Sequence, residues 1–153
     1  MNKMVLVSGA GGQLAQSFNY IANKNKWTSF IFLNKQELDI SSIENIYSVI
    51  DKHKPDIFIN CAAYTAVDKA ESEKDKAYLI NDKAVKNIAQ VCSEKNISLI
   101  HYSTDFVFNG KSEKPYIEND KTNPINIYGQ SKLAGEQSII NKQSLNYLII
   151  RKY

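Results

Sequence analysis

Short apolar runs that alternate with longer helical patterns constrain this chain more than any other feature. We predict strands at residues 4–7, 29–33, 56–60, 97–102 and 147–150. We predict helices at about 13–24, 41–53, 73–94 and 127–141. Helices between successive strands imply crossover connections, which produce a parallel sheet covered on both faces. Because crossovers are right-handed, the expected fold is α/β with a doubly wound parallel sheet, in one domain over residues 1–153.

The composition excludes several functional classes. Lysine and arginine total 19 against 16 acidic residues, and no basic cluster is interleaved with aromatics, so we expect no nucleic-acid partner. No apolar run approaches the roughly 18 residues that span a bilayer, and no signal-peptide pattern is present, so we expect no membrane partner. Two cysteines and two histidines cannot form a four-cysteine or His-rich site, so we expect no metal. Free thiols are typical of the reducing cytoplasm, the expected location.

A glycine-rich loop, residues 9–15, joins the first predicted strand to the first predicted helix. Unpaired N–H groups at a helix start carry partial positive charge and bind phosphate where no side chain blocks the approach. Gly9, Gly11 and Gly12 leave that approach open. No Gly-Lys-Ser/Thr follows, which excludes a Walker A loop and favours the pyrophosphate of a dinucleotide. The alternative is a tight strand-to-helix turn without a ligand.

The end of the second predicted strand bears on the choice of cofactor. Dinucleotide sites commonly place an acid there to bind the ribose hydroxyls. This chain has Asn34 and Lys35 instead. Asn34 can hydrogen-bond a ribose without repelling a 2′-phosphate, and Lys35 attracts one, so NADPH is slightly favoured over NADH. The alternative is that these two residues form only a solvated turn.

Tyr128 and Lys132 are four residues apart on a predicted helix and therefore share a face. A neighbouring ammonium stabilises a phenolate, so we expect Lys132, together with the positive nicotinamide of an oxidised cofactor, to lower the pKa of Tyr128. Tyr20 and Lys24 have the same spacing, but they lie at the far end of the first predicted helix and are interpreted as a surface pair. Thr104 follows a predicted strand at the ligand-facing edge, where its hydroxyl can hold a carbonyl oxygen while Tyr128 protonates it. These residues alone indicate a nicotinamide-dependent carbonyl/alcohol oxidoreductase.

Several sequence blocks together resemble a known family. They are Gly9–Leu14, Leu38–Ile40, Asn60–Glu71, Ser103–Phe108 and Tyr128–Glu136. In this combination they look like the dTDP-4-dehydrorhamnose reductase branch of the extended short-chain dehydrogenases/reductases. The similarity runs from residue 4 to residue 151. It implies a Rossmann-type, NAD(P)-binding domain.

The resemblance also implies a role for individual residues. NADPH or NADH would be bound by Gly9, Gly12, Gln13, Leu14, Asn34, Asp39, Ile40, Ala63, Tyr64, Thr65, Tyr102, Tyr128 and Lys132. The catalytic residues would be Thr104, Tyr128 and Lys132, and Thr104 and Asp105 would contact the sugar. The implied reaction reduces the 4-keto group of dTDP-4-dehydro-6-deoxy-L-mannose, a small-molecule nucleotide sugar, to give dTDP-L-rhamnose. Mg²⁺ belongs to expectations for the full-length family, and nothing in this chain supports it.

The sequence departs from the family pattern in three residues and in length. Ala15 stands where a third glycine is common, Asn34 replaces a frequent acid, and Phe106 replaces a common tyrosine. Family chains are longer, and their later half carries most of the sugar-nucleotide pocket. We therefore expect this chain to lack the family's carboxyl-terminal substrate domain and to have little activity alone. We also expect an uncovered edge strand to favour association into a homodimer.

Two other functions fit many of the same residues. One is a nucleotide-sugar epimerase or dehydratase of the same superfamily, which shares the glycine loop and the Tyr-Lys pair. The other is a non-catalytic, dinucleotide-binding regulatory subunit. The Tyr64–Glu71 and Ser103–Phe108 blocks favour a reductase, and the presence of Thr104, Tyr128 and Lys132 argues against a non-catalytic subunit.

Other polar residues have a structural interpretation. We interpret His101 as a strand residue and not as a general base, and Cys61 as a thiol without an activating histidine. The segment 68–71 either contacts substrate or caps a short helix. Asn81 lies within the long predicted helix, where a bond to a neighbouring loop is one option.

Overall fold

The sheet is parallel throughout and has five strands. The computed structural model describes residues 3–22, 24 and 28–152. Its strands are β1 (Lys3–Ser8), β2 (Thr28–Leu33), β3 (Ile57–Asn60), β4 (Ser98–Thr104) and β5 (Tyr147–Lys152). They lie in the order β2-β1-β3-β4-β5, and every neighbouring pair is parallel. The doubly wound α/β sheet expected from the sequence is therefore confirmed.

Helical segments connect each pair of successive strands. They are α1 (Gln13–Ala22), α2 (Ile43–His53), α3 (Val67–Ala70), α4 (Lys74–Tyr78), η1 (Leu79–Lys83), α5 (Ala84–Glu94), η2 (Asp105–Val107) and α6 (Ile127–Ile140). The long helix predicted at 73–94 is the continuous run α4-η1-α5, in which η1 is a π-helical turn. No helix within the described residues combines the length and apolar character needed to cross a bilayer.

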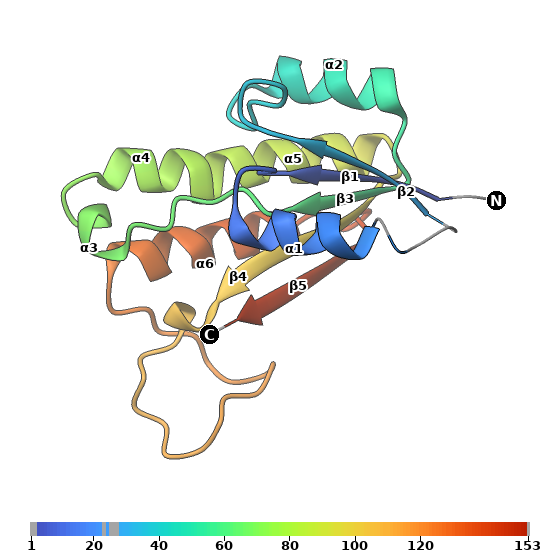
Figure 1. Cartoon of the computed structure of the whole chain (residues 1–153). Helices are drawn as coiled ribbons and strands as arrows, with labels where there is room; N and C mark the ends of the chain where they lie inside the picture. Colours follow the sequence, from blue (N-terminus) through green and yellow to red (C-terminus); the bar gives the residue numbers. More distant parts are fainter. Residues whose placement is uncertain (1–2, 23, 25–27, 153) are drawn as a thin grey trace.

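The helices cover the two faces of the sheet unequally. Figure 1 shows α1 on one face and α2, α5 and α6 on the other. Alternate strand residues pack against the helices on opposite faces of the sheet, because successive side chains of a strand point to opposite sides. Leu6, Phe58 and Leu99 pack in the larger core with α2, α5 and α6. Val7 and Ile59 pack in the smaller core beneath α1.

α2 begins two residues later than the predicted start at residue 41. Ser42 is its N-cap, and the Ser42 hydroxyl accepts the Asn45 N–H at 3.1 Å. The Ser41 hydroxyl is engaged elsewhere, because it donates to the Asp39 carboxylate at 2.6 Å. The capping position is thus shifted by the preceding turn.

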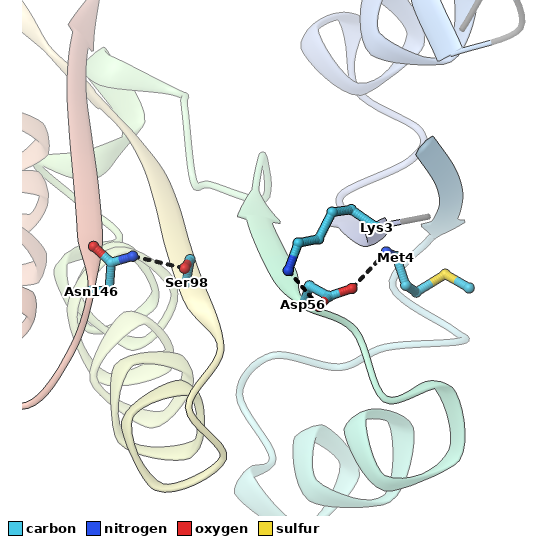
Figure 2. A network of polar contacts seen from close by, with 5 residues as sticks. All are labelled: Lys3, Met4, Asp56, Ser98 and Asn146. Atoms are coloured by element: carbon cyan, nitrogen blue, oxygen red, sulfur yellow. Dashed lines mark hydrogen bonds and ion pairs between the residues drawn. The ribbon is translucent and has the colours of Figure 1, made fainter. Parts of the chain in front are cut away.

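The amino ends of the strands are joined by polar contacts around Asp56. Figure 2 shows its carboxylate accepting the Met4 N–H at 2.8 Å and pairing with the Lys3 ammonium at 2.9 Å. Hydrogen bonding to the Met4 N–H, and then to Lys3, lowers the pKa of Asp56. On the next strands, Asn146 Nδ2 donates to Ser98 Oγ at 2.9 Å. These contacts fix the sheet edge opposite the glycine loop.

The strand order reverses between β1 and β3. From β1 the chain moves to β2 at one edge, and then crosses over to β3 on the other side of β1. Connections leave the carboxyl ends of β1 and β3 in opposite directions, which opens a crevice between them. The glycine loop after β1 and the segment after β3 therefore border the same crevice.

Candidate active site

A cleft of about 450 Å³ lies at this reversal point. It is lined by the glycine loop, by the segment after β2 and by the segment after β3: Gly9, Gly11, Gly12, Asn34–Gln36, Leu38–Ile40, Cys61–Tyr64 and Ile80. Gly9 has φ of 74°, and a Cβ at this position would lie 2.8 Å from the Ala62 nitrogen. Only glycine therefore allows the segments after β1 and β3 to approach each other so closely.

The start of α1 forms one wall of the cleft and is suited to an anion. The Gly12 N–H donates to the Gly9 carbonyl at 2.9 Å, and α1 begins at Gln13 without an acidic residue in its first turn. The first N–H groups of a helix have no intrahelical acceptor. A Cβ at Gly11 would meet no atom within 4 Å, so the approach to these groups is open. The cleft thus fits the pyrophosphate of a dinucleotide.

The segment after β2 is an ordered turn. The Asn34 side-chain oxygen accepts the N–H groups of Gln36 (2.9 Å) and Glu37 (3.2 Å). The Glu37 carboxylate in turn accepts the Asn34 N–H at 2.9 Å. Asp39 is held by Ser41, whose side chain and backbone hydrogen bonds lower the pKa of the Asp39 carboxyl. Asn34 therefore stabilises the turn while it lines the cleft.

Asn81, in the π-helical turn η1, links the cleft to α6. Its amide is buried and exchanges two hydrogen bonds with the Tyr64 backbone, at 2.9 and 3.0 Å. It also donates to the Ser131 hydroxyl at 3.0 Å. Tyr64 both lines the cleft and packs in a cluster with Tyr128. The wall of the cleft is thereby fixed to the helix that carries Tyr128 and Lys132.

Thr104 and Tyr128 lie together at the carboxyl end of β4. Both are buried, and the Thr104 side chain lies close enough to the Tyr128 phenol to affect its pKa. The chain's own groups do not produce the expected lowering of the Tyr128 pKa. Burial raises the pKa of its phenol above 10, the Thr104 side chain opposes this shift, and the Asp105 charge adds to it. Tyr128 is therefore a protonated phenol at neutral pH.

Lys132 is turned toward the backbone of β4. Its side chain is almost completely buried, and its ammonium donates to the Tyr102 carbonyl oxygen at 2.6 Å. Burial lowers its pKa from 10.5 to about 8, against the opposing effect of the Glu136 carboxylate. This direct backbone bond fixes the Lys132 ammonium against β4.

A row of buried polar side chains crosses the sheet beneath this site. Ser8 donates to the Asn60 side-chain oxygen at 2.8 Å, and Asn60 Nδ2 lies 3.1 Å from His101 Nδ1. Burial, and then the Lys132 charge, holds the pKa of His101 well below 6.5. His101 is therefore a neutral strand residue, as expected. Among the described residues, His101 Nε2 and Ser103 Oγ are buried atoms without a hydrogen-bond partner.

Comparison with known proteins identifies the family. Residues 2–152 match the family model described as the RmlD substrate binding domain. The chain belongs to the RmlD family. It is 39% identical over 136 residues to a dTDP-4-dehydrorhamnose reductase from Aggregatibacter actinomycetemcomitans, a match that covers 89% of this chain and 46% of the relative. A dTDP-4-dehydrorhamnose reductase from Escherichia coli is 45% identical over 113 residues, covering 74% and 38%.

Solved structures agree with this family assignment. A Bacillus anthracis dTDP-4-dehydrorhamnose reductase in complex with NADP superimposes with a TM-score of 0.93 at 38% identity. The match covers 100% of this chain and 56% of that one. A UDP-glucose 4-epimerase from Brucella ovis, at 21% identity and a TM-score of 0.82, shares the fold. The chain spans about half the length of the RmlD relatives it matches.

The cleft brings together seven of the residues implied to bind cofactor. These are Gly9, Gly12, Asn34, Asp39, Ile40, Ala63 and Tyr64. Gln13, Leu14, Thr65 and Tyr102 are not part of its lining. The Tyr102 ring packs against Phe18 under α1, with 6.1 Å between ring centroids, so only its carbonyl faces Lys132. The sequence contains no signal for two further residues: Ile80, an apolar helix residue that lines the cleft, and Ser131, whose contact with Asn81 joins segments far apart in the sequence.

Four further residues have structural or surface roles. Glu71 caps α6, since its carboxylate accepts the Ile127 N–H at 2.8 Å. Burial raises the pKa of the Cys61 thiol to about 12. Tyr20 and Lys24 form an exposed pair, with 2.9 Å between hydroxyl and ammonium. No group of three or more His, Cys, Asp or Glu side chains within the described ranges is arranged to hold a metal ion.

Proposed function

We propose that this chain binds NADPH or NADH and carries the cofactor site and proton donor of a dTDP-4-dehydrorhamnose reductase. The reaction would reduce the 4-keto group of dTDP-4-dehydro-6-deoxy-L-mannose to give dTDP-L-rhamnose. The observation that carries the proposal is the placement of Thr104 and Tyr128, both buried near Lys132 at the carboxyl edge of the same sheet as the open glycine loop.

Each catalytic residue would have a distinct role. When bound, the reduced nicotinamide supplies the hydride that reduces the carbonyl carbon. Tyr128, whose raised pKa keeps it protonated, would donate its proton to the carbonyl oxygen. Thr104 would orient that oxygen through its hydroxyl. Lys132 would present a positive charge to the ribose hydroxyls of the cofactor and to the developing phenolate of Tyr128.

The substrate would approach over Thr104 and Asp105. Thr104 donates to the Asp105 carboxylate at 3.0 Å, and Asp105 is exposed. An exposed carboxylate next to the reacting group can accept hydrogen bonds from sugar hydroxyls. A relative from Streptomyces niveus, 37% identical over 136 residues, is named dTDP-4-keto-6-deoxy-D-glucose reductase. A second 4-keto sugar nucleotide therefore belongs in the assay.

The experiment separates binding from turnover. We expect titration calorimetry to detect NADPH and NADH binding, and we expect slow oxidation of NADPH with the 4-keto substrate. Tyr128→Phe should remove the remaining turnover while preserving cofactor binding, whereas Tyr20→Phe, at the exposed pair, should change neither. Absence of dinucleotide binding would overturn the proposal. Binding with no turnover in any assay would favour the regulatory subunit, and cofactor recycling without net oxidation would favour an epimerase.

Association and location complete the proposal. β5 lies at the edge of the sheet, and Tyr147 (40% exposed) and Leu148 (53%) present apolar surface on it. Exposed edge strands pair readily with other strands, so we expect a homodimer in sedimentation experiments, with Leu148→Lys favouring the monomer. Cys61 and Cys92 are both free, which supports a reducing, cytoplasmic location.

A further inference from the structure

Glu136 is a completely buried carboxylate, and Arg151 is the only arginine of the chain. Arg151 on β5 binds it with both arms of its guanidinium: Nε donates to Oε1 at 3.0 Å and Nη2 to Oε2 at 2.7 Å. Two parallel charge-assisted bonds hold a carboxylate in one orientation. Glu136 is fully buried and the Arg151 side chain is 23% exposed. Removing a carboxylate from water is costly, and pairing it with a guanidinium adds little net stability, so we expect the pair to have a role beyond stability.

Arg151 also contacts the segment that precedes α6. Its guanidinium carbon lies 5.1 Å from the centre of the Phe108 ring, and Nη1 donates to the Glu118 carbonyl at 3.5 Å. In the sheet, Arg151 is paired with Ser103, the residue before Thr104. One side chain therefore connects β5, α6 and the long connection after β4, which extends away from the sheet in Figure 1.

Glu136 lies one helical turn after Lys132 and on the same face of α6. A direct Lys132–Glu136 ion pair is the obvious arrangement for this spacing. The structure has another one: both Glu136 oxygens accept from Arg151, and Lys132 donates to the Tyr102 carbonyl at 2.6 Å. Arg151 thus binds the Glu136 carboxylate, which would otherwise form an ion pair with Lys132 along the helix.

We infer that Arg151 and Glu136 form a positioning pair for Lys132: the guanidinium fork fixes the carboxylate, and Lys132 is left to extend its ammonium to β4 beside Tyr128. This inference rests on the proposed role of Lys132. Neither Arg151 nor Glu136 needs to touch the substrate, because each acts through the lysine.

The charges around Lys132 give the inference a measurable consequence. From β4 it is faced by His101, which is neutral, and by the Tyr102 carbonyl. From α6 it is faced by Tyr128 and Glu136, and Arg151 stands behind Glu136 on β5. The Glu136 carboxylate is the negative charge that raises the pKa of Lys132, which burial has lowered to about 8.

The decisive experiment changes both members of the pair at once. The double variant Glu136→Leu/Arg151→Met replaces a buried ion pair by apolar side chains, an exchange that proteins often accept without loss of stability. The pKa of Lys132 is read from the ¹³Cε signal of labelled lysine, assigned with Lys132→Arg. We expect this pKa to fall by about one unit, which reduces the charged fraction at pH 8 about fivefold. NADPH affinity at pH 8 should weaken in parallel.

The single variants separate positioning from plain structural support. In Arg151→Met the Glu136 carboxylate is released to pair with Lys132, so the Lys132 pKa should rise, opposite to the double variant. Asp51→Asn, which removes a carboxylate from the exposed Lys95–Asp51 pair, should leave the Lys132 signal unchanged. If the double variant does not fold, Glu136→Gln provides the same measurement with a smaller change in shape, and the Lys132 pKa should again fall.

An unchanged Lys132 pKa in the folded double variant, or in Glu136→Gln, would overturn the inference. The lysine titration needs no cofactor. Failure of the wild-type chain to bind NADPH would therefore contradict the proposed function and leave the positioning pair standing, so the two failures are distinguishable.

Discussion

A Cβ atom on Gly135 would lie 2.1 Å from the backbone oxygen of Asn81, so α6 rests directly against the π-helical turn η1. The same turn presents the Asn81 side chain to Tyr64 and Ser131. π-Helical turns inside α-helices occur frequently at functional sites. Here the turn holds one wall of the cleft against the helix that carries Tyr128 and Lys132.

We expect Gly135→Ala to destabilise the protein by about 1–3 kcal/mol, because the methyl group forces α6 away from the backbone of η1. Urea unfolding measures the loss. The Asn81 side-chain amide signals should shift as well, since the contact with Ser131 is strained. If this variant is as stable as wild type, α6 can move away from η1 without a loss of free energy of unfolding.

Gly11→Ala should weaken cofactor binding without a loss of stability. The added methyl meets no atom within 4 Å, so the free energy of unfolding should change by less than about 0.5 kcal/mol. NADPH binding should nevertheless weaken, because the methyl group narrows the approach to the first-turn N–H groups of α1. If calorimetry shows that the stable variant binds NADPH as tightly as wild type does, the pyrophosphate does not bind at the start of α1.

His101 predicts an acid-sensitive fold. Its pKa is well below 6.5 in the native state and normal in the unfolded state, so only the unfolded chain takes up a proton just below pH 6.5. Its contribution makes stability fall as pH drops through this range, by about 1.4 kcal/mol per pH unit. Urea unfolding between neutral and mildly acidic pH measures this slope.

Replacing the ring provides the control for that slope. His101→Phe should flatten the pH dependence of stability, whereas Tyr20→Phe, in the exposed pair with Lys24, should leave it as in wild type. Equal slopes in wild type and His101→Phe would assign the acid sensitivity to other groups.

Lys35 should influence the choice between the two nicotinamide cofactors. It lines the cleft at the end of β2, close enough to Asp39 for its charge to lower the pKa of that carboxyl. We expect Lys35→Glu to weaken NADPH binding more than NADH binding, since the new charge repels a 2′-phosphate. Lys111→Glu makes the same change of net charge on the exposed connection after β4 and should alter neither affinity. Equal losses for the two cofactors would exclude a 2′-phosphate contact.

The fold was predictable because its evidence is periodic and local. Five apolar runs with helical patterns between them specify a parallel sheet, and the glycine loop after β1 marks the crevice. Which of two neighbouring residues caps a helix is harder to predict. Ser41 and Ser42 have equal intrinsic capping ability, and the Asp39 carboxylate decides between them by binding Ser41.

Features of the site that depend on distant residues could not be read from the sequence. Arg151 reaches Glu136 only because β5 lies beside β4 in the folded sheet. The raised pKa of Tyr128 follows from burial, which is set by tertiary packing and not by the spacing to Lys132. The placement of the Tyr102 ring on the α1 face likewise follows from strand alternation in the folded sheet and not from a motif.

Asp56 binds the Met4 N–H and the Lys3 ammonium at the amino ends of the strands, away from the cleft. The two ends of the sheet therefore have different roles, one in stability and one in ligand binding. All five strands run in parallel, so the residues proposed to bind ligand lie near or beyond their carboxyl ends, while the contacts of Asp56 and Asn146 hold strands together near the amino ends. The amino-end edge is consequently the place to attach a fluorophore, an affinity handle or a surface tether. A label there leaves the cleft free and reports on the integrity of the sheet alone.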